Sequence, residues 1–154
     1  MEICRGILAR RAQTLKIFIA LIFSVTIAIK KGGSMENVVT VLQIVIALGI
    51  INVWILRPGK STSWRGGAAK SMQEEFKVYG LPAWFMYLIG FLKCVLAALL
   101  IVGIWIPVLT MPAAIAMAAM MLGAVSMHIR VKDSLKKSLP AFTMLVLSLA
   151  VAFL

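Results

Sequence analysis

The chain has 154 residues, of which 62% are hydrophobic and only 14% are charged. A soluble domain carries about 25% charged and 45–50% apolar residues, and the mean hydropathy of this chain is +1.04. This composition excludes an ordinary soluble domain and predicts an all-α, polytopic transmembrane helix bundle. The net charge of +11 does not indicate nucleic-acid binding, because the basic residues form short clusters between apolar runs rather than one soluble face.

The first apolar run, Ile17–Ile29, follows a basic stretch and is short for a membrane span. We expect a signal anchor here, since no clear cleavage site follows that would mark a signal peptide. Translation from Met35 would leave the run out altogether. We therefore divide the chain into a basic N-terminal extension with a signal-anchor-like helix, residues 1–34, and a four-helix membrane domain, residues 35–154.

Four later apolar runs are long enough, or nearly so, to cross a bilayer, which takes about 20 apolar residues. They are Val38–Leu56, Ala83–Ile106, Met111–Ile129 and Leu139–Leu154. Basic residues gather before Ile17 and in the loops 57–82 and 130–138, whereas the opposite side carries only Lys30 and Lys31. The positive-inside rule therefore predicts that both loops are cytoplasmic and that the C-terminus faces outside, in a cell membrane or a bacterial inner membrane.

The link Pro107–Thr110 is so short that the helices on either side of it must form an antiparallel hairpin. Helices in lipid approach each other closely at small residues. Small residues recur at helical spacing in both helices, at Gly90, Cys94, Ala98, Ala116, Ala119 and Gly123. We predict that these two stripes form the packed seam of the hairpin; the alternative is that small residues recur by chance in Ala-rich helices.

The loop 57–82 is predicted to contain a short amphipathic helix. Ser71 and Glu74 have the spacing of a capping box, in which each side chain accepts a hydrogen bond from the other's backbone N–H. Larger apolar side chains recur on one face, at Met72, Phe76 and Tyr79. We expect this helix at the cytoplasmic interface, where it either packs under the bundle or docks a partner. Aromatic rings at headgroup level flank it, at Trp64 and Trp84.

Lys93 is the outstanding polar residue within a predicted span. It lies about 15 Å along its helix, at about 1.5 Å per residue, which is near the bilayer centre. A lysine there costs about 2.5–3.5 kcal/mol on insertion scales, which makes it a candidate functional residue. No carboxylate lies within a predicted span. Three arrangements would resolve this: Glu74 or Glu75 is tucked into the bundle, the amine is neutral, or an anionic or electron-rich ligand pairs with it.

Further polar residues are predicted near the cytoplasmic ends of the helices. Together with Lys93 they suggest a polar vestibule, whose candidate residues are Lys93, His128, Asn52, Glu74, Glu75 and Asp133. His128 is a candidate for binding a proton or a quinone carbonyl, and a hydrogen-bonded structural histidine is the alternative. A single histidine is a weak metal signal, because sites usually need three or four ligands. We predict no metal site.

Several short motifs follow one another in a recognisable order. Tyr79-Gly80-Leu81-Pro82 precedes a span with Gly90, and a later span holds Met120, Met121, Ala124 and His128, followed by Asp133 and Pro140. This order resembles that of the DoxX-like membrane proteins over residues 38–154. The resemblance implies a four-helix core in which His128 and Asp133 occupy the family's His and Asp positions. Lys93 departs from the pattern, since many members carry Glu there.

The resemblance also supplies the functional hypotheses. Relatives include a subunit of a thiosulfate–quinone oxidoreductase, components of redox-defence complexes and a receptor-assembly chaperone. We therefore expect an accessory subunit of a membrane redox complex, with quinone as the cofactor that the resemblance implies. The alternative is an assembly or scaffold factor for other membrane proteins; small-molecule binding or transport ranks third, because no inverted repeat is detectable. We find no catalytic constellation, so we expect no enzymatic activity from this chain alone. The expected partners are the lipid bilayer and other membrane proteins or a second copy.

Overall fold

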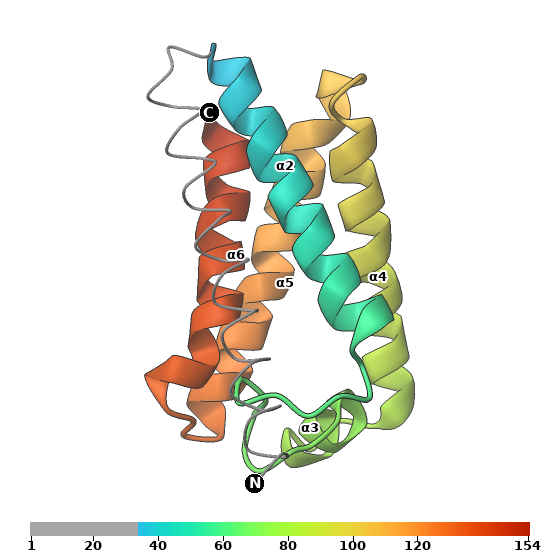
Figure 1. The fold of residues 1–154 in the computed structure, drawn as a ribbon, viewed down its shortest axis with the longest axis vertical. Helices are drawn as coiled ribbons and strands as arrows, with labels where there is room; N and C mark the ends of the chain where they lie inside the picture. The colour runs from blue at the N-terminus through green and yellow to red at the C-terminus, as the bar shows by residue number, and fades with distance from the viewer. Residues whose placement is uncertain (1–33) are drawn as a thin grey trace, which may run out of the picture. The chain divides into compact units, whose positions relative to one another are not determined.

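A computed structural model describes residues 34–154, and the run Ile17–Ile29 lies outside the described residues. Over this range the chain is helical and contains no strand. The helices are α2 (Met35–Ile51), α3 (Met72–Val78), α4 (Ala83–Val102), α5 (Thr110–Arg130) and α6 (Leu135–Phe153) (Figure 1). A π-helical turn, Asn52–Leu56, continues α2, and a short 3-10 turn, Pro107–Leu109, precedes α5. The predicted all-α class is confirmed.

Four helical stretches are long and apolar enough to cross a membrane. They are Met35–Leu56, Ala83–Val102, Pro107–Arg130 and Leu135–Phe153. The four predicted spans are thus confirmed, although their ends are shifted. The last helix begins at Leu135, four residues before the predicted start at Leu139. The apolar run in the sequence begins later than the helix because the first helical turn carries Lys136 and Lys137.

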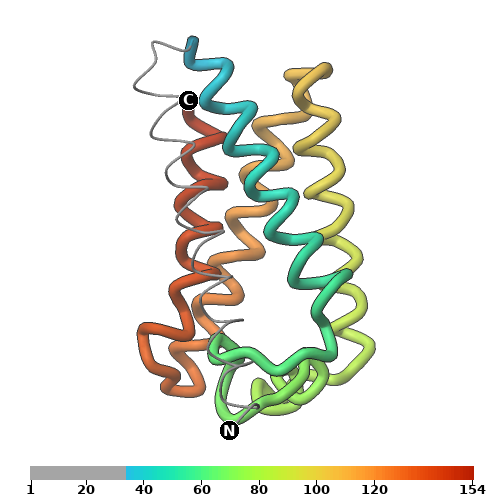
Figure 2. The backbone as a smooth tube through the Cα atoms, viewed as in Figure 1, coloured from blue at the N-terminus to red at the C-terminus, as the bar shows by residue number. Residues whose placement is uncertain are grey.

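The compact unit that contains the candidate site runs from Leu42 to Leu154. Within it, α4 and α5 form the predicted antiparallel hairpin, and α6 returns along α5 (Figure 2). The side-chain amide of Gln43 donates to the hydroxyl oxygen of Thr110 at 2.9 Å, and Thr110 donates in turn to the Gly103 carbonyl at 3.1 Å. These bonds tie α2 to the connection between α4 and α5, where water would otherwise have to satisfy the polar groups.

The packed face of the hairpin differs from the predicted small-residue stripes. Three of the predicted seam residues are exposed, namely Ala98, Ala119 and Gly123, and two are half-buried, namely Cys94 and Ala116. The buried residues of α4 are instead Met86, Gly90, Lys93, Ala97 and Leu100. Those of α5 are Ala113, Ala114, Met117, Ala118, Met121 and His128. The predicted seam is therefore wrong for the exposed residues, because spacing identifies a stripe but not the direction in which it faces.

Gly90 is buried for a reason that its spacing did not reveal. A Cβ atom on Gly90 would lie 2.5 Å from Cε3 of Trp54, which is closer than real side chains approach. Trp54 belongs to the π-helical turn after α2, and its ring meets Phe76 edge-on with 6.1 Å between centroids. The absence of a side chain at Gly90 thus lets the indole of Trp54 approach α4 closely.

Helix α3 packs under the bundle through the face that the sequence indicated. Met72, Phe76 and Tyr79 are 5%, 8% and 8% exposed. The first two form a buried cluster with Met86 of α4. The packing interpretation of this helix is therefore supported, since its apolar face lies against protein.

The ends of α3 are close to the prediction. The Ser71 hydroxyl accepts from the Glu74 backbone N–H at 3.2 Å, which confirms Ser71 as the N-cap. The Glu74 carboxylate accepts from the backbone N–H of Lys70 at 2.7 Å rather than from that of Ser71, so the predicted capping box is only half correct. The chain leaves α3 at Gly80, whose φ of +75° is a conformation that glycine adopts without strain.

Both basic loops lie at the same end of the unit. In Figure 1, α3 and the connection between α5 and α6 are at the bottom, whereas the C-terminus is at the top. A hydrogen bond from the Gly67 backbone N–H to Asp133 joins the two loops directly. This arrangement agrees with the charge count that placed both loops on one side; the cytoplasmic assignment of that side stays a prediction.

Candidate functional site

The site begins at the C-terminal end of α5, where the chain turns back sharply. The backbone N–H of Asp133 donates to the His128 carbonyl at 3.0 Å, and that of Lys132 donates to the Ile129 carbonyl at 3.0 Å. These two bonds, with Lys132 at a φ of +55°, form a Schellman cap. The cap folds Asp133 back over the last turn of α5, beside the side chain of His128.

Asp133 makes most of the polar contacts at the turn between α5 and α6. Its carboxylate lies 2.8 Å from Nδ1 of His128 and accepts from the Gly67 backbone N–H at 2.9 Å. Lys137, in the first turn of α6, lies 3.4 Å from the same carboxylate. The Lys137 ammonium also donates to the Gly67 carbonyl. Asp133 therefore holds together the loop before α3, the end of α5 and the start of α6.

Tyr79 connects this group to α3. Its hydroxyl lies 3.3 Å from Nδ1 and 3.4 Å from Nε2 of His128, and it donates to the Glu75 carboxylate at 3.1 Å. Gly66 makes room for the ring, because a Cβ atom there would lie 2.4 Å from the Tyr79 oxygen. A buried polar path thus runs from Asp133 through His128 and Tyr79 to Glu75.

Glu75 is buried and fully paired. Arg65 lies 3.0 Å from its carboxylate, and the Gly66 backbone N–H donates to it at 2.6 Å. The Arg65 guanidinium also donates to three backbone carbonyls, those of Arg57, Pro58 and Lys60. Because a guanidinium has five donors in a fixed fork, one buried arginine orders the start of the loop and anchors α3 at the same time.

The protonation states follow from these contacts. Burial opposes ionisation of Asp133, but hydrogen bonds from His128, the Gly67 backbone and Lys137 outweigh it and hold the pKa of that carboxyl below its usual value. Burial, and then the negative charge of Glu75, raises the pKa of Tyr79 well above its usual value. Asp133 is therefore an anion and Tyr79 a neutral hydroxyl at physiological pH.

Lys93 lies apart from this polar network, within the span α4. It is 6% exposed, and its ammonium lies 5.2 Å from the ring centroid of Trp54. Across residues 34–154 it makes no hydrogen bond or ion pair. The buried carboxylate of Glu75 is paired with Arg65 instead. A cation–π contact stabilises a desolvated ammonium by about 2 kcal/mol, but it does not take the place of hydrogen bonds from the three N–H donors, for which the described range 34–154 supplies no acceptor.

The predicted vestibule therefore divides into two parts. Glu75, His128 and Asp133 belong to the polar network, and Lys93 pairs with an aromatic ring. Glu74 is exposed. Asn52 is half-buried in the π-helical turn and has no hydrogen bond to the other candidates. The prediction that Asn52 and Glu74 line one site with Lys93 and His128 is thus not supported by the geometry.

The sequence reasoning missed several members of the site, namely Trp54, Arg65, Tyr79 and Lys137. Arg65 was counted among the basic loop residues, although the following pair Gly66-Gly67 could have marked a close backbone approach. Tyr79 was assigned to the apolar face of α3 for its ring, and its hydroxyl was overlooked. The described residues contain no cluster of three or more histidine, cysteine or acidic side chains that could hold a metal ion.

Four apolar helices with both basic loops at one end, closed there by a buried polar network, define a small polytopic integral membrane protein. A family model described as the DoxX-like family matches residues 60–153. The protein belongs to the DoxX-like family. The match begins later than the resemblance over residues 38–154 suggested, but it includes the whole polar network from Arg65 to Lys137. In the same comparisons no curated protein and no solved structure matched the chain.

Proposed function

We propose that this protein is an accessory subunit of a quinone-linked membrane redox complex, and that Lys93 contacts the quinone headgroup. The observation that carries the proposal is the buried side chain of Lys93 within a span. Its ammonium lies over the Trp54 ring and makes no hydrogen bond or ion pair with any residue of the described range 34–154. Keeping such a group in hydrocarbon is costly, and intramembrane ionisable residues are usually retained for function.

The residues around Lys93 fit a quinone headgroup better than those of the polar network do. The ammonium is a donor for a carbonyl oxygen, and such charge-assisted hydrogen bonds are stronger than neutral ones. The ring nitrogens of His128 are already close to Tyr79 and Asp133, so this histidine is less suited than Lys93 to bind a quinone carbonyl. A bound quinone would supply two-electron, two-proton redox chemistry to a partner enzyme that holds the electron donor.

Fluorescence quenching of Trp54 provides a direct binding test. We would replace Trp64, Trp84 and Trp105 with Phe, so that Trp54 is the remaining indole. Decylubiquinone should then quench the fluorescence saturably in proteoliposomes. Lys93→Met keeps the length and apolar bulk of the side chain but removes the donors, and we expect it to weaken binding about tenfold or more, as for a lost hydrogen bond to a charged group.

The control for this experiment is Lys77→Met, which removes an exposed lysine of α3 and should leave the binding curve unchanged. Quinone-pool reduction in membranes that carry Lys93→Met or His128→Ala gives the functional readout. Unsaturable quenching that is identical in the Lys93→Met variant, together with unchanged pool reduction in both variants, would eliminate the proposal.

One observation favours a scaffold role as the second candidate. Ala98 of α4 and Ala119 and Gly123 of α5 are exposed, and a Cβ atom on Gly123 would meet no atom within 4 Å. Small exposed residues on spans are suited to close approach by a helix of another protein. Affinity purification in mild detergent tests this candidate: a stoichiometric partner that is lost in Gly123→Leu supports it, and recovery of a lone monomer contradicts it.

A further inference from the structure

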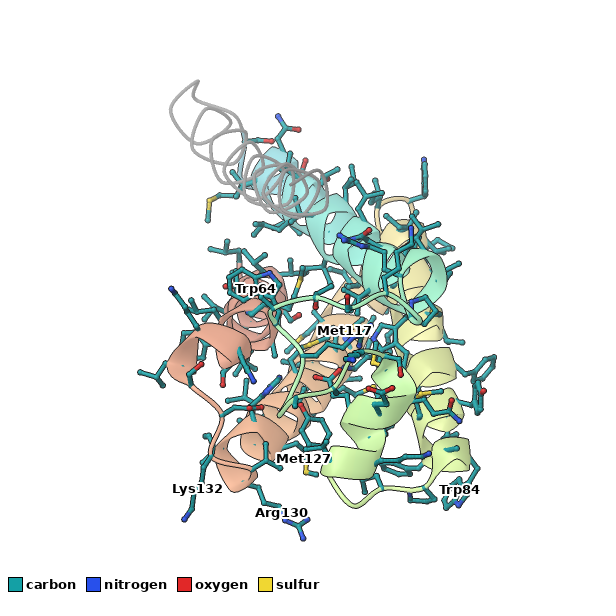
Figure 3. All side chains as sticks on the ribbon, turned by 60° about the horizontal axis from the view of Figure 1, so that its bottom comes forward. Trp64, Trp84, Met117, Met127, Arg130 and Lys132 are labelled. Atoms are coloured by element: carbon teal, nitrogen blue, oxygen red, sulfur yellow. The ribbon has the colours of Figure 1, made fainter. Side chains whose placement is uncertain are left out.

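The loop end of the bundle carries exposed positive charge. Figure 3 brings this end forward, with Arg130 and Lys132 extending outward beside the turn between α5 and α6. The exposed basic side chains of these loops and helix ends are Lys60, Lys70, Lys77, Arg130, Lys132 and Lys136. We call this group of residues the basic face.

The polar network removes most of the negative charge from the same region. Glu75 is buried against Arg65, and Asp133 is buried between His128 and Lys137. Of the carboxylates described between α3 and the start of α6, Glu74 alone is exposed. The internal ion pairs thus leave the basic face almost without acidic neighbours, so it presents a nearly uniform positive potential.

The position of the basic face along the helices fixes its depth. Arg130 is the last residue of α5, and Lys136 lies in the first turn of α6. Trp84 is 65% exposed in the first turn of α4 and points away from the bundle (Figure 3). Tryptophan and the charged ends of spans lie at the level of the lipid headgroups. The part of the basic face at the turn between α5 and α6, with Arg130, Lys132 and Lys136, therefore borders the headgroup layer.

We propose that the basic face binds anionic phospholipid headgroups of the leaflet next to it. Lysine and arginine side chains donate charge-assisted hydrogen bonds to phosphate oxygens, and each basic residue near a charged membrane surface contributes about 1 kcal/mol, or about a fivefold change in affinity. An acidic protein would offer complementary charge too, but residues at span ends meet the surrounding lipid first. This proposal is independent of the quinone assignment.

Tryptophan quenching by brominated lipids can test it, because two indoles lie at opposite ends of α4. Trp84 is at its start, and Trp105 follows its last residue, Val102. One reporter protein carries Trp64→Phe with Trp105→Phe, and the other carries Trp64→Phe with Trp84→Phe; both keep Trp54 as a common background. Each is reconstituted in phosphatidylcholine vesicles that contain either brominated phosphatidylglycerol or brominated phosphatidylcholine.

We expect the Trp84 reporter to prefer phosphatidylglycerol about fivefold or more, and the Trp105 reporter to show no preference. The preference should fall at high salt, which screens exposed charges, and each of Lys132→Gln and Lys136→Gln should reduce it. Glu74→Gln removes the exposed acid and should increase it.

Two results would overturn the proposal. One is an equal lipid preference at both reporters; the other is a Trp84 preference that the two lysine variants leave intact. If phosphatidylglycerol is not preferred but an acidic protein is retained in a salt-sensitive manner, the lipid assignment is likewise wrong and the face serves that protein.

Discussion

His128 and Asp133 are joined twice, once through their side chains at 2.8 Å and once through a backbone hydrogen bond of 3.0 Å. The backbone bond belongs to the cap that ends α5, so the same turn that stops the helix also places the carboxylate on the imidazole. Because local backbone geometry fixes the pair, a change of the Asp133 side chain removes its charge without removing the cap. The network can therefore be tested one contact at a time.

The first prediction concerns Asp133 and acid pH. Because the pKa of Asp133 is lowered in the folded protein, its contribution to stability is complete above the unfolded-state value of about 4 and is lost as pH falls through the lower folded-state value. Asp133→Asn should lower the free energy of unfolding by about 1–3 kcal/mol at neutral pH, since it weakens hydrogen bonds to a buried charge.

Denaturant unfolding in detergent from pH 7 downward measures this difference. The gap between wild type and Asp133→Asn should begin to narrow below about pH 4, where Asp133 of the unfolded chain takes up a proton, and should close once the pH falls below the lower folded-state pKa and the native carboxylate is protonated too. Glu74→Gln is the control at neutral pH, because it neutralises an exposed carboxylate and should change the stability little. A gap of constant size across the whole range would show that the charge of Asp133 is not what stabilises the loop.

The second prediction concerns Tyr79 and alkaline pH. Since burial raises the pKa of its hydroxyl, its stabilising effect is complete below the unfolded-state value of about 10 and is lost as pH rises above it. Tyr79→Phe should cost about 1–2 kcal/mol at neutral pH through the lost hydrogen bonds, and the cost should shrink above about pH 10.

Tyrosinate absorbance provides the measurement for Tyr79. The chain has two tyrosines, so a Tyr87→Phe background isolates the signal of Tyr79. Its ionisation should then coincide with unfolding, which circular dichroism follows in parallel. Ionisation of Tyr79 in a protein that is still folded at pH 10 would contradict the buried contacts with Glu75 and His128.

The third prediction compares two helical glycines. Gly90→Ala should destabilise the bundle by about 1–3 kcal/mol, because its new methyl group would collide with the Trp54 ring and overpack the contact. Gly123→Ala meets open space and should be neutral or stabilising by up to about 1 kcal/mol, as expected for alanine within a helix. The measurement is thermal unfolding of the wild type and the two variants in the same detergent, in which the shifts in Tm are compared. Equal effects would mean that the Trp54 contact does not restrict Gly90.

The fourth prediction concerns the left-handed residue of the α5 cap. Lys132 has a φ of +55°, which costs a residue with a Cβ atom about 1 kcal/mol relative to glycine. Lys132→Gly should therefore raise the free energy of unfolding by up to about 1 kcal/mol, whereas Lys132→Ala should not. Lys136→Gly, in the first turn of α6, serves as the opposite control and should destabilise. A loss of stability in Lys132→Gly would indicate that the lysine side chain contributes more than its backbone strain costs.

The sequence alone determined the features that depend on neighbouring residues. Apolar runs marked the four spans, because hydrocarbon requires an unbroken apolar helix of sufficient length. Ser71 was identified as an N-cap, and the short link after α4 implied the hairpin. The resemblance to the DoxX-like family was confirmed by the family match over residues 60–153, whereas the assignment of His128 and Asp133 to the family's His and Asp positions stays a prediction. The division of the chain at residue 34 and the signal anchor stay predictions.

The tertiary structure decided which polar groups meet. Tyr79 and His128 are 49 positions apart, and Gly67 and Asp133 are 66 apart, so no local pattern relates them. The predicted small-residue seam failed at Ala98, Ala119 and Gly123 for the same reason, since the direction of a stripe depends on what packs against it. Apolar spans and helix caps depend on residues that are neighbours in the sequence, so both can be predicted from the sequence alone. A buried charge, in contrast, is stable only beside its partner, and folding alone brings Arg65 to Glu75 and leaves Lys93 with the ring of Trp54.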